Sequence, residues 1–173
     1  MSQNHQIYVE RQSGRDVEAM SLAAELRSVL HLPDLEHLRL ISLYEISGLE
    51  ERELSSAAAG ILYEAPTDRL LPSFVPQGRF IAREYLPGQF DQRADSAERC
   101  LRLLWPERDI DVKRADIFVL SGHLDDEAME KIRSWLINPV DSRPKDLNRS
   151  SLGRSSREPL SLTRLDGFVS KTK

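Results

Sequence analysis

Residues 83–104 read REYLPGQFDQRADSAERCLRLL, and the elements on either side can be placed by working outward from this stretch. It begins in the alternating pattern of a strand at residues 80–85 and breaks at Pro87-Gly88, because proline fixes its own φ and glycine tolerates positive φ. A polar run leads into a helical pattern whose apolar residues share one face: Ala97, Leu101 and Leu104. The stretch therefore predicts a strand, a polar loop and a helix.

The same alternation of elements extends toward both ends of the chain. Alternating apolar residues predict strands at residues 7–9, 36–46, 80–85 and 111–120. Apolar residues at helical spacing predict helices at residues 16–30, 54–62, 95–105 and 125–138. Asp16 and Asp125 are well placed to cap two of these helices. Residues 64–78 hold three prolines and a glycine, which predicts an irregular linker without a strand or helix.

Similar residues recur at a fixed distance along the chain. Ile7 and Ile81 lie 74 positions apart, and so do the Ser-Gly turns at residues 47–48 and 121–122. This spacing predicts a divergent duplication of one α+β unit. The resulting domain organisation is a first unit at residues 1–66, a linker at 67–78, a second unit at 79–140 and a tail at 141–173.

The tail differs in composition from the rest of the chain. Residues 141–173 hold eight Lys or Arg and four Asp or Glu, a net charge of +4, which leaves −8 for residues 1–140 of the total of −4. They also hold seven serines and a single aromatic residue, and such a composition is a poor builder of a core. We therefore predict a flexible basic tail whose Arg-Ser-Ser repeats belong to a solvated linker.

Length, charge and hydropathy restrict the class of protein. The 173 residues, 40% of them apolar, suffice for one domain or two small ones. A net charge of −4 argues against a dedicated nucleic-acid-binding protein, and no apolar run reaches the roughly 18 residues of a membrane span. The single cysteine suits a reducing compartment, and the first residues lack the pattern of a secretory signal. We therefore expect a cytoplasmic protein that binds neither nucleic acid nor membrane.

The sequence offers no obvious catalytic, cofactor or metal site. Cys100 lies in a helical pattern without a paired histidine, which favours a structural thiol. The four histidines lack the spacing of metal ligands, and the acidic residues 125–127 are typical of the first turn of a helix. Neither GxxxxGK[ST] nor GxGxxG occurs. We therefore predict no catalytic, cofactor-binding or metal-binding residue in this chain.

Two long segments carry a family resemblance. EYLPGQFDQRADSA at residues 84–97 and SGHLDDEAMEKIRSWLINPVDSR at residues 121–143 resemble, in the same order, the N-terminal PurS-like region of large phosphoribosylformylglycinamidine synthases. Weaker similarity covers residues 8–66. The last residues, LTRLDGFVSKTK, resemble the start of the linker region that follows in that family, so we expect a fragment of a longer enzyme.

The resemblance implies both a fold and a role. The fold would be α+β, with two tandem PurS-like β-α-β-β-α units related by a pseudo-twofold axis. Their antiparallel sheets would carry helices on one face and leave the other face for each other or for a partner. The role would be non-catalytic assembly in de novo purine biosynthesis: bridging the synthetase and glutaminase domains of the same enzyme and helping to enclose the ammonia path. ATP and Mg would bind elsewhere in that enzyme, and this part alone would be inactive.

A second interpretation is a regulatory domain that binds a small molecule between two tandem units.

The loop in the first of these segments is the candidate site. The resemblance implies a position at an interface or along a channel for Pro87, Gly88, Gln89, Phe90, Asp91, Gln92, Arg93 and Asp95. Phe90 is an apolar residue in a polar loop, so we expect it to be exposed in this chain alone, together with Gln89, Gln92 and Arg93. The alternatives are packing within the domain, an N-cap at Asp95, and a local ion pair between Arg93 and Asp91.

Overall fold

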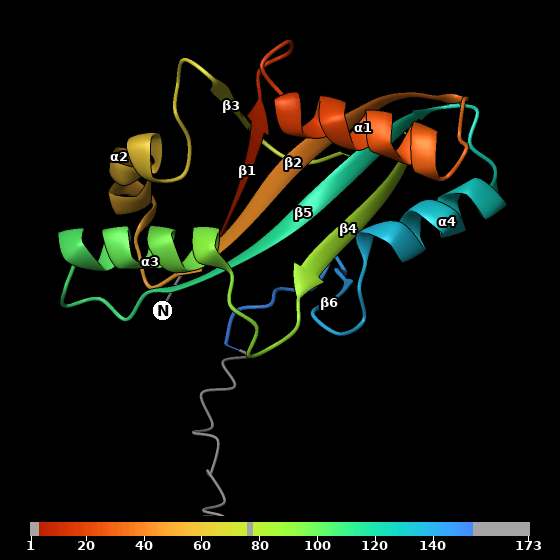
Figure 1. Ribbon diagram of the computed structural model, residues 1–173. Coiled ribbons are helices and arrows are strands. Elements are labelled where there is room, and N and C mark those ends of the chain that lie inside the picture. The colour runs from red at the N-terminus through yellow and green to blue at the C-terminus, as the bar shows by residue number, and fades with distance from the viewer. Residues whose placement is uncertain (1–3, 76–77, 154–173) are drawn as a thin grey trace, which may run out of the picture.

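Strands and helices alternate along the chain in the computed structural model, which describes residues 4–75 and 78–153 (Figure 1). In order they are β1 (His5–Arg11), α1 (Val17–Val29), β2 (Leu35–Ser47), α2 (Glu51–Ile61), β3 (Asp68–Leu71), β4 (Arg79–Tyr85), α3 (Gln92–Leu104), β5 (Asp111–Gly122), α4 (Asp126–Leu136) and β6 (Ser142–Pro144). The predicted α+β class is confirmed, and each predicted strand and helix is present.

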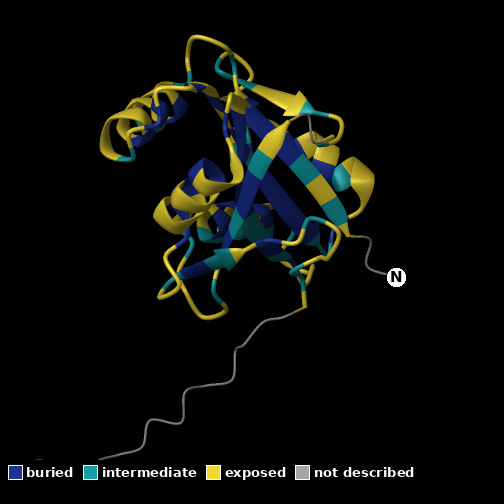
Figure 2. Cartoon of the chain, turned by 90° about the vertical axis from the view of Figure 1, so that its right-hand side faces the viewer, coloured by how far each residue is buried: buried dark blue, intermediate teal, exposed yellow. Residues whose placement is uncertain are grey.

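All six strands of the described residues form one antiparallel sheet, in the order β3-β1-β2-β5-β4-β6. The two longest strands, β2 and β5, lie at its centre and pair from Leu35 opposite Gly122 to Ser47 opposite Asp111. These central strands are largely buried (Figure 2). The expectation of separate sheets is therefore wrong, because the long β2–β5 ladder joins both halves of the chain into one sheet.

The strand registers repeat at the spacing of 74 residues. Glu10 lies opposite Ile41 in the β1–β2 pair, and Glu84 lies opposite Ala115 in the β4–β5 pair. The edge strands follow the same rule, because Arg69 in β3 and Arg143 in β6 lie opposite Glu10 and Glu84. Each half thus has the order β-α-β-α-β, which corrects the expected β-α-β-β-α.

The third strand of each half lies in a segment expected to have none. β3 falls within the segment of residues 64–78 predicted to be an irregular linker, and β6 falls within the predicted tail. Both are edge strands of four residues or fewer, too short for a period-two pattern to appear in their sequence. β6 also ends in Pro144, a residue that sheets tolerate at their edges.

Aspartate side chains cap three of the helices. Asp16 and Asp125 cap α1 and α4 as predicted, by accepting N–H groups of the first turn. Asp91 caps α3 in the same way, so that α3 begins at Gln92, three residues before the predicted start. Asp95 therefore lies in the first turn, and its assignment as an N-cap is wrong.

All four helices cover one face of the sheet, in two groups (Figure 1). Leu26 of α1 and Ile132 of α4 share a buried cluster with Phe118 of β5. The apolar residues of α2 and α3 share a second cluster with Ile46 of β2. Burial of these stripes against the sheet is the main stabilising contribution that the sequence pattern encodes.

The opposite face carries a third apolar cluster, formed by strand residues such as Ile41 and Ile117. Phe74 and Leu147, from the segments that follow β3 and β6, pack against it. The chain therefore covers this face itself. The expectation that the two units meet each other through this face is wrong, because both units lie in one sheet.

A buried ionic network fixes the segment after β6 to this face. The Lys145 side chain is only 1% exposed and donates to Oε2 of Glu45 at 2.7 Å. The backbone N–H of Ser151 donates to the same oxygen at 2.9 Å. The prediction of a flexible tail is therefore wrong for residues 141–153, where a buried carboxylate holds the lysine. Its remainder, residues 154–173, lies outside the described part of the chain.

Acid should weaken this network through Glu84. Burial would raise the pKa of its carboxyl, but hydrogen bonds from Ser151 and Arg143 and the charge of Lys145 lower that pKa below its ordinary value. Such a carboxyl stabilises the fold above its unfolded-state pKa, and this contribution is lost as the pH falls through the folded-state pKa. Glu84→Gln should therefore shrink the difference in unfolding free energy, measured in urea, between about pH 7 and about pH 3. The exposed Glu107 gives the control variant Glu107→Gln, and an equal shrinkage there would contradict the assignment.

Candidate functional site

The connection between β4 and α3 is a tight turn followed directly by the helix cap. The N–H of Gln89 donates to the carbonyl of Leu86 at 3.0 Å. Gly88 lies between them with φ of 91°, a conformation that glycine adopts without a steric cost. The Asp91 side chain then accepts the first N–H groups of α3. The backbone of the loop is thus fixed by its own hydrogen bonds.

The side chains predicted to be exposed in this loop are exposed. Phe90 is 68% exposed, and Gln89, Gln92 and Arg93 also lie at the surface. The prediction is confirmed for all four residues. Packing of Phe90 within the domain, the alternative, does not occur.

The two segments that carry the family resemblance meet at this loop. The N–H of Leu86 donates to the carbonyl of Asp141 at 2.8 Å, and the Gln89 amide donates to the carbonyl of Val140 at 3.5 Å. Val140 is 75% exposed, close to the exposed fraction of Phe90. We call the exposed residues Gln89, Phe90 and Val140 the Phe90–Val140 surface.

A groove of about 650 Å³ lies beside this surface, between the loop, one side of α3 and the start of β5. The Arg114 side chain, 7% exposed, forms ion pairs there with Asp91, at 3.5 Å, and with Asp116. Burial would lower the pKa of the Arg114 guanidinium, but the charges of Asp116 and Asp91 raise it, so that the group remains charged. The pair with Asp91 ties the start of α3 to the sheet.

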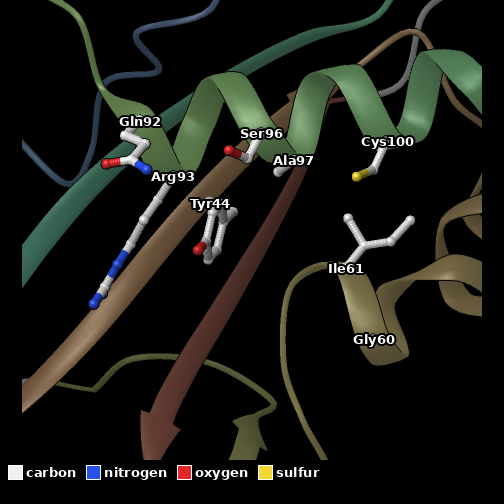
Figure 3. Close-up of a pocket in the computed structure, with 8 residues that line it drawn as sticks. All are labelled: Tyr44, Gly60, Ile61, Gln92, Arg93, Ser96, Ala97 and Cys100. Atoms are coloured by element: carbon white, nitrogen blue, oxygen red, sulfur yellow. The ribbon is translucent and has the colours of Figure 1, made fainter.

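The predicted site residues divide between two sides of α3. One set lines the groove: Pro87, Gly88, Gln89, Phe90, Asp91 and Asp95. Gln92 and Arg93 line a separate pocket of about 340 Å³ between α2 and α3 (Figure 3). The eight residues therefore border two different hollows, because Gln92 and Arg93 lie on the side of α3 that faces away from the groove.

Both halves of the chain contribute to the pocket between α2 and α3. Its lining residues are Tyr44, Gly60, Ile61, Gln92, Arg93, Ser96, Ala97 and Cys100. Figure 3 shows Cys100 and Ile61 pointing toward one another across the pocket, and Tyr44 beside the extended side chain of Arg93. Burial raises the pKa of the Tyr44 phenol, against the opposing charges of Arg114 and Arg93. The phenol therefore remains protonated at neutral pH.

Arg93 pairs across the molecule and not with its neighbour in sequence. Its guanidinium lies 3.3 Å from the carboxylate of Glu18 at the start of α1. Asp91 uses its carboxylate to cap α3 and to pair with Arg114. The prediction of a local ion pair between Arg93 and Asp91 is therefore wrong.

Sequence reasoning missed Arg114 and Tyr44, which lie on the central strands. Both faces of β5 are buried, so the positions of its apolar residues do not show which face the helices cover. The available signal was that Arg114 and Asp116 follow one another on the helix-covered face, between the apolar residues Val112 and Phe118. Charges at such positions need partners, and they pair with each other.

Other sequence predictions concern metal, membrane and thiol chemistry. Within residues 4–75 and 78–153, no group of three or more His, Cys, Asp or Glu side chains is placed to hold a metal ion. No helix in the same part of the chain combines the length and the apolar character needed to cross a membrane. Cys100 is exposed on α3, so its thiol is not part of the core.

No family model matches this sequence, and no curated protein matches it either. The resemblance of the two segments and the geometry of the surface that they form therefore carry the functional interpretation.

Proposed function

We propose that this chain is the N-terminal PurS-like assembly region of a phosphoribosylformylglycinamidine synthase. In that family a glutaminase releases ammonia from glutamine, and a synthetase uses ATP to activate the amide oxygen of formylglycinamide ribonucleotide before ammonia displaces phosphate. The region would join those two domains of the same enzyme and help to enclose the ammonia path. It would act in the cytoplasm, and ATP and Mg would bind to the synthetase domain.

The observation that carries the proposal is the meeting of the two resembling segments. Residues 84–97 and 121–143 are separated in sequence, yet backbone and side-chain hydrogen bonds hold them together at the loop. Their exposed apolar residues, Phe90 and Val140, lie where the fold itself does not use them. A rigid loop that presents exposed apolar side chains suits a permanent contact with a neighbouring domain, because little freedom is lost when it docks.

The repeated architecture supports the PurS-like part of the proposal. Gly48 directly follows β2 and Gly122 ends β5, 74 positions apart, and each lies against the backbone at the start of the other strand. A Cβ at Gly48 would lie 2.1 Å from the carbonyl oxygen of Asp109, and one at Gly122 would lie 1.9 Å from that of Asp34. Reciprocal contacts of this kind are expected of two units related by a pseudo-twofold axis between β2 and β5.

Charging the Phe90–Val140 surface should uncouple the two activities of the enzyme. Phe90→Asp and Val140→Asp each place a charge where a partner domain would bury an apolar group. In the enzyme that contains all its domains, glutamine-dependent activity should fall about tenfold, the equivalent of about 1.4 kcal/mol. Ammonia-dependent activity should fall by less than about twofold, because the synthetase site itself is untouched.

The matched control is Leu103→Asp. Leu103 is 82% exposed on α3 and does not border the groove or the Phe90–Val140 surface. Its variant should leave both activities unchanged. Equal losses with glutamine and with ammonia at Phe90→Asp would count against a coupling role, and so would a loss of the same size at Leu103→Asp.

A further inference from the structure

The pocket between α2 and α3 offers hydrogen-bond donors and one cation. Its polar groups belong to Tyr44, Gln92, Arg93, Ser96 and Cys100, and none of the described residues that line it is an aspartate or glutamate. This lining contrasts with the net charge of −4 of the whole chain. The volume of about 340 Å³ lies within the range of about 300–1,000 Å³ that is typical of small-molecule sites. Arg93 also lines a neighbouring hollow that holds Asp16, Glu18 and Asp68, so it lies between an acidic side and this pocket, which has no carboxylate. Arg93 and the neutral donors on the pocket side therefore suit a small ligand that carries negative charge.

A break in α2 shapes one wall of the pocket. The backbone leaves helical geometry at Ala59, with ψ of 128°, and at Gly60, with φ of 84°. Ile61, directly after the break, points toward Cys100 on α3 (Figure 3). A Cβ at Gly60 would meet no atom within 4 Å, so space remains beside this wall. The break thus provides an apolar wall at Ile61 next to open space.

Arg93 can change its partner at low cost. Its ion pair with Glu18 has an N–O distance of 3.3 Å, and both side chains are more than half exposed. Exposed pairs of this kind contribute about 0–1 kcal/mol. A phosphate group offers a guanidinium two parallel charge-assisted hydrogen bonds, a stronger arrangement than one long contact. A phosphate in the pocket can therefore compete with Glu18 for Arg93.

We propose that this pocket binds a small phosphate monoester, with the phosphate on Arg93 and the body of the molecule against Ile61 and the ring of Tyr44. The hydroxyl of Ser96, which lies on the same side of α3 as Arg93, supplies a neutral donor to the phosphate. This binding site is separate from the assembly role and does not depend on it, because the Phe90–Val140 surface lies beside the groove on the other side of α3.

Cys100 reports directly on occupancy of the pocket. It is the single cysteine of the chain, it is exposed, and it points into the pocket (Figure 3). AMP and adenosine differ only in the phosphate, so AMP should slow alkylation of Cys100 by neutral iodoacetamide, whereas adenosine should not. With AMP at about ten times a millimolar Kd, the expected slowing is about tenfold.

Three variants test the role assigned to Arg93. Arg93→Gln should abolish the protection by AMP, because it removes the cation. Glu18→Gln should strengthen the protection, because it removes the carboxylate that competes for Arg93. Arg99→Gln is the control, since Arg99 is an exposed arginine on the same helix that pairs with Asp95 and does not line the pocket. This variant should keep the protection of the unmodified chain.

All of these side chains are exposed, so the variants should keep the fold, and their circular dichroism spectra should match that of the unmodified chain. The proposal is overturned if AMP at about 10 mM does not slow the alkylation. Equal slowing by adenosine would overturn it as well, because the phosphate would then be irrelevant. Protection that survives Arg93→Gln would do the same.

Discussion

Replacing Lys145 by methionine should lower the free energy of unfolding by about 3–5 kcal/mol, the usual cost of removing one partner of a buried ion pair. The ammonium of Lys145 is almost wholly buried and lies 2.7 Å from the carboxylate of Glu45 and 3.3 Å from that of Glu84. Methionine fills a similar space but leaves the carboxylates buried without their shared cation. Urea denaturation near neutral pH, followed by tryptophan fluorescence, measures the change.

A double variant separates the lost charge from the lost packing. Lys145→Met combined with Glu45→Leu removes both charges and should recover much of the loss, because apolar replacement of a whole buried pair is often neutral. Lys131→Met is the control, since Lys131 is half exposed and pairs with Glu127 along α4, and it should cost less than about 0.5 kcal/mol. A loss below about 1 kcal/mol at Lys145→Met would show that the network does not hold the segment after β6.

Gly122→Ala should destabilise the fold by about 3 kcal/mol or more, because it combines backbone strain with a steric clash. Gly122 has φ of 124°, a conformation that residues with a Cβ rarely adopt. The added Cβ would lie 1.9 Å from the carbonyl oxygen of Asp34 and 2.9 Å from the backbone nitrogen of Glu36. These are backbone atoms, so the clash is relieved only if the chain at the start of β2 moves. Thermal unfolding of the variant measures the effect.

Gly14→Ala measures the cost of the backbone strain without a steric clash. Gly14 also has a positive φ, 79°, but a Cβ there would meet no atom within 4 Å. Its variant should cost only about 1–2 kcal/mol, the usual penalty of a left-handed conformation. Gly48→Ala should behave like Gly122→Ala, since its Cβ would lie 2.1 Å from the carbonyl oxygen of Asp109. Equal losses at Gly14 and Gly122 would mean that close approach of the backbone plays no part.

Periodicity located the long elements and failed for the short ones. The stripes of α1, α3 and α4 and the alternation in β2 are long enough to stand out from the composition. β3 and β6 are not, because the segments Asp68–Leu71 and Ser142–Pro144 are too short to show a period of two residues. They become strands because they pair with the free edges of β1 and β4. The local sequence does not contain this information, because it depends on where the other strands lie.

The sequence predicted which side chains of the candidate site are exposed, but not that the residues of the site divide between two sides of α3. The apolar Phe90 in a polar loop correctly indicated a surface residue. The division of the motif depended on where α3 begins, and the choice between Asp91 and Asp95 as N-cap cannot be made from spacing alone. Asp91 wins because Arg114, which is distant in sequence, holds its carboxylate against the sheet. Gln92 and Arg93 are then fixed on a helix face that turns away from the groove.

The repeated register has a consequence for how many partners the chain can engage. Asp16 and Asp91 are the N-caps of α1 and α3, so the residue that corresponds to Phe90, directly before the cap, is the exposed cation Arg15. At the spacing of 74 residues, the counterpart of Val140 is Pro66. Within residues 4–75 and 78–153 the scaffold therefore occurs twice, but the Phe90–Val140 surface occurs once. A symmetric dimer of identical units would offer a partner two copies of every surface. This chain would instead offer a single copy of this surface to any domain that docks there.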